Sequence, residues 1–213
     1  MKYTYRFRRY ITGIGARRLL FMLLGNIFLS MGVGIFKISG LGNDPFNGMN
    51  MALAAKFSVS YPLFQLLLSL ALFAVEFAFG RSLIGVGTIV NALLLGYFNA
   101  FFYWLFHLVF EPGSFLSRLI TMIVGVIVCS FGISLYQTSD AGVAPYDSLA
   151  MILDRRLPKI PYFWCRIFCD GPCALVCFLA GGIVGLGTLT TTFGFGPVIH
   201  FFNKTVSEKM VNG

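Results

Sequence analysis

Six long apolar runs limit what this chain can fold into. They lie near residues 18 to 37, 61 to 80, 83 to 107, 118 to 138, 161 to 180 and 183 to 203. Each matches the length of about 20 helical residues that crosses a hydrocarbon core of roughly 30 Å. With 57% apolar and 11% charged residues, the chain has too little polar surface for a water-soluble globule. The runs are apolar on every face, whereas barrel strands alternate, so the sequence predicts an all-α polytopic membrane protein.

The two halves of the chain repeat each other at a shift of 100 residues. Twelve of 36 aligned positions are identical between residues 18–53 and 118–153, and they include the pairs Gly42/Gly142 and Pro45/Pro145. The motif GVGT at 85–88 aligns with GLGT at 185–188. We therefore expect one membrane domain that consists of a basic juxtamembrane segment (1–17), a first repeat (18–110) and a second repeat (111–213).

Each repeat predicts a spanning helix, a glycine-rich break, a short helix and two more spanning helices. Three crossings is an odd number, so the second repeat should be inverted in the membrane, as in many secondary transporters. The positive-inside rule places both termini in the cytoplasm, because that side then receives Arg81, Arg155, Arg156, Lys159, Lys204 and Lys209. The basic N-terminus and the formal charge of +8 indicate contact with the lipid bilayer, and no motif points to nucleic acid.

The segment GLGNDPFNGMNMAL, residues 40–53, interrupts the apolar pattern of the first repeat. Pro45 suits the first position of a helix, where its missing N–H costs nothing. Asp44, just before it, is a preferred N-cap residue. A short helix should begin at Pro45, with Asn47 and Asn50 near its positive end.

The corresponding segment of the second repeat is DAGVAPYDSLAMIL, residues 140–153. Pro145 again predicts the helix start, but the position of Asp44 is taken by alanine. The carboxylates stand elsewhere, because Asp140 precedes the turn and Asp147 replaces an asparagine. The backbone frame thus recurs while its charges do not.

Two interpretations of the short helices compete. They are either interfacial amphipathic helices, with Phe46, Met49, Leu53 and Phe57 toward the lipid, or half-helices whose N-termini converge on a cavity at depth. We favour the second, because paired interrupted segments in corresponding positions are the best sequence pointer to a transport site. Helix N-termini attract an anionic group and the carboxylates attract a cation or proton, and a zwitterionic or ion-coupled solute satisfies both.

Several other polar residues interrupt the spanning runs. Asn91 and Thr191 are candidates to line the same cavity, although a threonine that bonds back to its own helix is the commoner case. Arg166 and Asp170, at i, i+4 spacing, predict an ion pair with either a gating or a structural role. Glu76 stands close to the end of its run, which favours an interfacial position over a proton relay.

The cysteines and histidines give no sign of catalysis or metal binding. Cys165, Cys169, Cys173 and Cys177 form a stripe along one helix, which does not converge on a point and is better explained by packing. No disulfide framework is implied. No nucleophile with a nearby base, metal-ligand motif or phosphate-binding loop is present. We expect a non-enzyme without catalytic residues, metal or cofactor.

The two interrupted segments, together with GVGT and GLGT, resemble the YczE-like bacterial membrane proteins, related to the YyaS/YitT group. The resemblance covers nearly the whole chain, and its most specific part is the turn that ends in proline, an aromatic residue and Asn or Asp. It implies a small multi-pass protein of the bacterial plasma membrane. That family is largely uncharacterised, so the resemblance transfers no substrate.

The leading hypothesis is an inverted-repeat transporter for an unidentified small polar or zwitterionic solute, with an ion or proton as a conceivable coupling partner. The predicted binding residues are Asp44, Asn47, Asn50, Asn91, Asp140, Tyr146, Asp147 and Thr191. The alternative is a membrane subunit that captures a substrate without transporting it, or a regulatory accessory protein. The sequence leaves homo-oligomer formation open.

Overall fold

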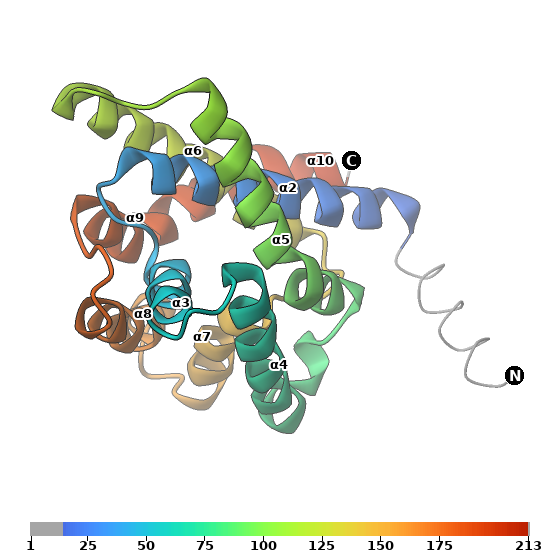
Figure 1. The fold of residues 1–213 in the computed structure, drawn as a ribbon. Coiled ribbons are helices and arrows are strands. Elements are labelled where there is room, and N and C mark those ends of the chain that lie inside the picture. Colours follow the sequence, from blue (N-terminus) through green and yellow to red (C-terminus); the bar gives the residue numbers. More distant parts are fainter. Residues whose placement is uncertain (1–14, 213) are drawn as a thin grey trace, which may run out of the picture.

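The computed structural model describes residues 15–212, and every regular element in that range is helical (Figure 1). Most of the basic segment predicted at 1–17 lies outside it. The longer helices are α2 (Ala16–Ser39), α3 (Pro45–Lys56), α4 (Tyr61–Phe79), α5 (Val86–Val109), α6 (Phe115–Thr138), α7 (Pro145–Arg156), α8 (Tyr162–Leu179) and α9 (Leu186–Phe202). The described range also contains a 3-10 turn, a π-helical turn and a short helix, which are η1 (Arg81–Leu83), η2 (Asn203–Ser207) and α10 (Glu208–Asn212).

Five helices, α2, α4, α5, α6 and α8, are long and apolar enough to cross a membrane. The run predicted at 183–203 differs, because α9 has only 17 residues. Residues 183–185 of this run are not helical, and the helix begins after the N-cap Gly185. Helical backbone then continues from α9 through η2 into α10. The all-helical architecture with several apolar helices is therefore confirmed, whereas the last predicted run contains a shorter helix that does not qualify as a span by length.

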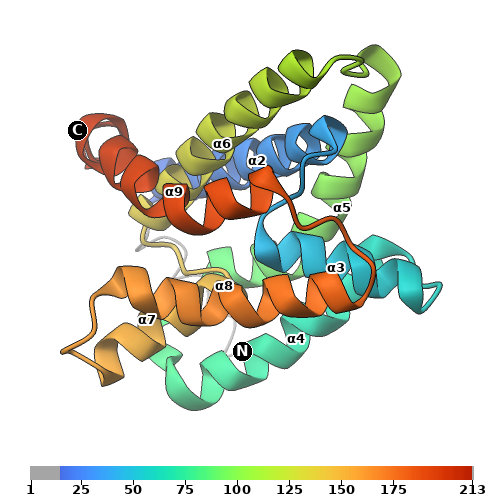
Figure 2. The same ribbon diagram turned by 90° about the vertical axis from the view of Figure 1, so that its left-hand side faces the viewer.

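An antiparallel pair, α2 and α6, lies along one side of the fold (Figures 1 and 2) and supplies most of its buried hydrophobic core. The two helices come so close at their glycines that their backbones are in contact. A Cβ atom at Gly25 would lie 2.5 Å from the backbone N of Tyr136, and one at Gly132 would lie 2.2 Å from that of Leu29. Since such separations are far below van der Waals contact, only glycine fits at these positions.

The contacts of this helix pair recur with the roles of the two repeats exchanged. Gly32 of α2 lies against Cys129 of α6, just as Gly132 of α6 lies against residue 29 of α2. Gly25 meets Tyr136 in the same way that Gly125 meets Phe36. Each contact therefore occurs twice, at positions that differ by 100 residues in both partners.

The two GxGT motifs join the repeats at the interrupted segments. The backbone N–H of Gly87 donates to the carbonyl of Ala141 at 2.7 Å, and that of Gly187 donates to Leu41 at 2.8 Å. Each motif thus holds the turn that precedes the short helix of the other repeat. A Cβ at Gly85 would lie 2.2 Å from the Ala141 oxygen, which explains the glycines at these helix starts.

The short helices begin at the two prolines, as predicted, and lie inside the helix bundle (Figure 2). Both pack against α4 and α8. The interfacial interpretation fails for Phe46, which is buried and stacks on Tyr146 with ring centroids 4.1 Å apart. Phe57, at the far end of α3, is exposed. The first turns of α3 and α7 are therefore surrounded by protein.

Candidate functional site

The first turn of α3 carries a hydrogen-bonded network that we call the amide cluster, which comprises Asp44, Asn47, Tyr61 and Asn99. The backbone N–H of Asn47 donates to Asp44 Oδ1 at 3.1 Å, as predicted for an N-cap. The Asn47 amide Nδ2 donates to both oxygens of that carboxylate, at 3.1 and 2.9 Å. The Tyr61 hydroxyl and Asn99 Nδ2 both donate to Asn47 Oδ1, at 2.8 and 3.1 Å. Asn47 is thereby fixed, and it orients the carboxylate.

The first turn of α7 carries a second network, the charge cluster, which comprises Tyr136, Tyr146, Asp147, Arg166 and Asp170. The Arg166 guanidinium donates from Nη1 to Asp147 Oδ1 at 2.5 Å and from Nε to Asp170 Oδ2 at 3.2 Å. Tyr136 donates its hydroxyl to Asp147, and Tyr146 donates its own to Asp170. The ion pair expected within α8 is present, and it is extended to α7 by a second carboxylate.

The two clusters meet at a cavity of about 40 Å³, here called the central cavity. Both N-cap residues, Asp44 and Ala144, line it, so the N-termini of α3 and α7 converge there. The polar side chains in its wall are Asp44, Asn47, Ser69, Asn91, Tyr146, Asp147 and Arg166. A space of this size holds about one water molecule, so a solute enters only if the surrounding helices move apart.

The charges around the central cavity do not balance. Asp44, Asp147 and Asp170 are buried, with exposed fractions of 6%, 6% and 1%, and Arg166 is the only cation that pairs with any of them among the described residues. Buried carboxylates are costly unless each is compensated. The site therefore has a capacity for positive charge, which protons or a cationic group of a ligand would satisfy.

A larger polar cleft of about 270 Å³ adjoins the central cavity. Arg166 and Phe195 line both spaces, so they separate one from the other. The cleft also has Asp154, Arg155 and His200 in its wall. Arg166 and Phe195 are thus the shared wall between the polar cleft and the central cavity.

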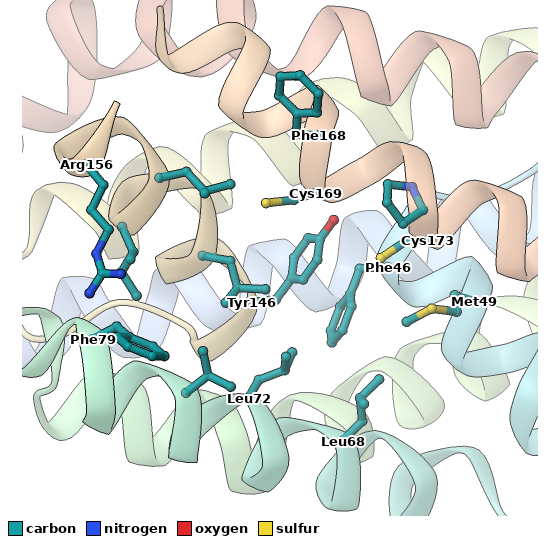
Figure 3. Close-up of a pocket in the computed structure, with 15 residues that line it drawn as sticks. Phe46, Met49, Leu68, Leu72, Phe79, Tyr146, Arg156, Phe168, Cys169 and Cys173 are labelled. Carbon is teal, nitrogen blue, oxygen red and sulfur yellow. The ribbon is translucent and has the colours of Figure 1, made fainter. Parts of the chain in front are cut away.

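An apolar groove of about 480 Å³ adjoins the central cavity on another side (Figure 3). Its walls are α4, with Leu68 and Leu72, and α8, with Cys169. The stacked rings of Phe46 and Tyr146 line both the groove and the central cavity. This ring pair is therefore the partition between an apolar and a charged environment.

The remaining predicted residues lie at different distances from the cavity. Asn91 lines it and donates to Asn26 Oδ1 at 2.7 Å. Asn50 is buried but donates back to the carbonyl of Phe46, and Thr191 bonds back to its own helix at residues 187 and 188. Asp140 is at the surface, with its side chain 89% exposed and 3.8 Å from Arg18. The clusters therefore do not include Asn50, Thr191 or Asp140.

Several members of the two clusters were not among the predicted residues. Tyr136, Tyr61 and Asn99 lie in or beside long apolar runs, where a tyrosine is normally an interfacial residue. Asn99 offered a signal, because an amide inside a spanning helix generally needs a partner. The partners themselves come from distant segments, and only the packing of the helices brings them together.

The cysteine stripe of α8 is divided between two environments. Cys165 and Cys177 are buried, whereas Cys169 and Cys173 line the apolar groove. No three His, Cys, Asp or Glu residues in the described part of the chain are grouped so as to hold a metal ion. The two buried thiols, Cys165 and Cys177, lie in the interior as small apolar groups.

The sequence of this chain matches a known protein family and several relatives. The model of the Family of unknown function DUF6198 matches residues 16–204. An uncharacterized protein of Haemophilus influenzae is 27% identical over 187 residues, which cover 88% of this chain and 84% of the relative. The uncharacterized protein YyaS of Bacillus subtilis is 25% identical over 89% of this chain and 94% of its own. The uncharacterized membrane protein YczE of Bacillus subtilis is 23% identical over 86% and 84%. No solved structure matches.

Proposed function

The chain belongs to this family of unknown function, and we propose that it is a small membrane transporter for a polar or zwitterionic solute. The observation that carries the proposal is the convergence of two helix N-termini on one buried cavity with an excess of carboxylates. Discontinuous helices that meet inside the membrane are how many secondary transporters bind charged groups of their substrates. The protein lies in a bacterial membrane, in agreement with its apolar helices and its relative YczE.

The two sides of the central cavity suit opposite charges. Asp44 has hydrogen-bond partners but no cation close enough for an ion pair among the described residues, so it attracts an amino or quaternary ammonium group. On the opposite side, α7 begins without a side-chain cap, and Arg166 stands beside it. A carboxylate there would gain the helix dipole and the guanidinium. A solute that carries both groups, such as an amino acid or a betaine, fits this asymmetry.

The arrangement of the repeats supports alternating access. The exchanged contacts of the antiparallel α2 and α6 are those expected of two inverted copies. We infer six crossings, the sixth supplied by α9 with its extension, and both termini on the cytoplasmic side. In this scheme Arg166 is a gate, because it separates the central cavity from the polar cleft and is held closed by Asp147 and Asp170.

Transport by the purified protein in liposomes tests the proposal. A panel of amino acids, betaines and polyamines is first screened for thermal stabilisation of the protein, and uptake of the radiolabelled hits is then measured. We expect Asp44→Asn and Asp147→Asn to reduce uptake at least tenfold, while Glu111→Gln, which removes an exposed carboxylate, leaves it unchanged. A protein that binds a hit without moving it is a capture subunit. If both aspartate variants transport normally, the site is wrong.

A further inference from the structure

Glu76 is a buried carboxylate that the proposed solute site does not use. It lies in α4, its exposed fraction is 0%, and neither of its oxygens has a hydrogen-bond partner among the described residues. It shares one face of α4 with Gln65 and Ser69, which are also buried. An ionised carboxylate in this position would have lost its hydration without compensation.

Charged residues stand on the helices around Glu76, but those with a positive charge are engaged elsewhere. On α7, Ser148 lies opposite Glu76 and donates to the carbonyl of Pro145 at 2.8 Å, and Asp147 is close enough to act on Glu76 electrostatically. The other charged residues of α7 are engaged elsewhere, because Asp154 lines the polar cleft, Arg155 donates to Ser82 at 2.7 Å and Arg156 lies over the ring of Phe79. On α3 and η1, the other elements packed against α4, Lys56 and Arg81 are exposed to solvent. On α5, His107 stands near the C-terminal end, where it pairs with Glu111. Among the described residues, no cation therefore forms an ion pair with Glu76.

The second repeat shows that packing does not require an acid here. When α4 and α8 are aligned at their first residues, Tyr61 and Tyr162, Glu76 corresponds to Cys177. Cys177 faces Gly48, whose Cβ position lies 3.4 Å from its sulfur, as Glu76 faces Ser148. A neutral thiol thus fills the equivalent place, and the carboxylate must have another role.

We propose that Glu76 is a proton-binding site that exchanges its proton with water when the helices around it move. A neutral carboxylic acid removes the cost of the unpaired charge. A metal ion is a poorer occupant, because it needs several converging oxygen ligands, and no three His, Cys, Asp or Glu residues in the described part of the chain are grouped so as to hold one. The reaction is simple addition of a proton to the Glu76 carboxylate, with water as its source and acceptor.

The adjacent charge cluster gives the proton site a means of coupling, and this step rests on the proposed function. Arg166 compensates Asp147 in the present arrangement. If a carboxylate of the solute draws Arg166 away, the negative charge of Asp147 is left to favour protonation of Glu76, because like charges disfavour joint ionisation. Solute binding and proton binding would then reinforce each other.

Carbodiimide labelling tests the proton site without any transport assay. Dicyclohexylcarbodiimide is an apolar reagent that adds to protonated carboxylic acids, and the N-acylurea product retains the whole reagent mass without a leaving group. The protein in lipid nanodiscs is labelled at a series of pH values, and the α4 peptide is weighed by mass spectrometry. We expect labelling of Glu76 that falls about tenfold per pH unit above its titration midpoint.

Two variants at Glu76 and one control variant make the labelling experiment decisive. Glu76→Gln should lose the adduct, and it should also lose one carboxylic acid band in the infrared difference spectrum against wild type. Glu76→Cys copies the second repeat and should fold even if the glutamine does not. Glu111→Gln, matched in chemistry but exposed, should label at Glu76 as wild type does. Glu76 that remains unlabelled from pH 5 to 9 and contributes no acid band would overturn the proposal, as would labelling that responds to Na⁺ and not to pH.

The labelling and transport experiments test the two proposals independently. If labelling depends on pH but the protein transports no panel compound, the proton-site proposal stands and the transporter proposal is wrong. If the protein takes up a panel compound but Glu76 is never labelled, the transporter proposal stands and the proton-site proposal is wrong.

Discussion

Helices α4 and α8 hold corresponding places in the two repeats, yet their inward faces differ in chemistry. Gln65 and Ser69 of α4 correspond to Arg166 and Asp170 of α8 when both helices are aligned at their first tyrosine. The α8 pair is tied into the charge cluster. Gln65 is buried without a hydrogen-bond partner for either amide atom in the described residues. The same backbone frame thus holds a charged network with its hydrogen bonds satisfied on α8, and a buried amide without partners on α4.

Between these two helices, the groups without partners lie on α4, which makes α4 the helix with more to gain from a second position. A buried amide without partners costs free energy, and Gln65 lies on the same face as the unpaired Glu76. A second arrangement of α4 against its neighbours would relieve both. The α8 network opposes movement on its own side, because each polar group there already has a partner.

The largest effect should come from removing the cation of the satisfied side. Arg166→Met leaves Asp147 and Asp170 buried without compensation, and we expect it to lower the free energy of unfolding by about 3–5 kcal/mol. The matched change on the unsatisfied side, Gln65→Leu, should be neutral or stabilising by about 1 kcal/mol, because it removes unpaired polar atoms. Titration of micelle-bound protein with SDS measures both. Equal losses would show that the two faces do not differ in the way described.

The glycine contacts common to both repeats should be next in size. Gly132→Ala places a methyl group 2.2 Å from Leu29 N, and Gly32→Ala places one 2.6 Å from Cys129. We expect either to cost about 2–3 kcal/mol and to reduce the yield of monodisperse protein in size-exclusion chromatography. Gly171→Ala is the control, because nothing lies within 4 Å of its Cβ position. If only one of these two variants greatly lowers the free energy of unfolding, the two equivalent glycine contacts do not contribute equally to stability.

The N-caps of the short helices allow a smaller test. Asp44→Ala gives α3 the uncapped start that α7 has at Ala144, and it should cost about 1–2 kcal/mol. Asp44→Asn keeps an acceptor for the Asn47 amide and should cost only a few tenths. Thermal unfolding of the two variants separates the role of the cap from that of the charge. A full loss with asparagine would show that the carboxylate itself stabilises the fold.

Part of this arrangement was predictable from the sequence because it depends on residues that are adjacent in the chain. Pro45 and Pro145 start helices through their fixed φ, and Asp44 caps α3 from the adjacent position. The repeat similarly located both short helices, because a shift of 100 residues aligns their prolines. The partner of each GxGT motif, by contrast, lies in the other repeat and has no sequence signal of its own.

The site was less predictable because its members converge through packing. Asp147 was expected from its place on α7, whereas its partner Tyr136 comes from the end of α6. Glu76 was assigned to an interfacial position on its distance from the helix end. Glu76 follows Gln65 by 11 residues, or about three helical turns, so both side chains lie on the same face of α4. This spacing was the sequence signal that Glu76 points inward.

The smallest effect should come from the turns that precede the short helices. Asp140 and Gly40 are equivalent residues, and both have left-handed backbone, with φ of 52° and 65°. Asp140→Gly makes the turns alike. It relieves the strain of a side chain at positive φ but removes an exposed pair with Arg18 at 3.8 Å. These opposing terms should leave the free energy of unfolding within about 0.5 kcal/mol of wild type. A loss above 1 kcal/mol in the SDS titration would give the Asp140 carboxylate a structural role that its 89% exposure does not account for.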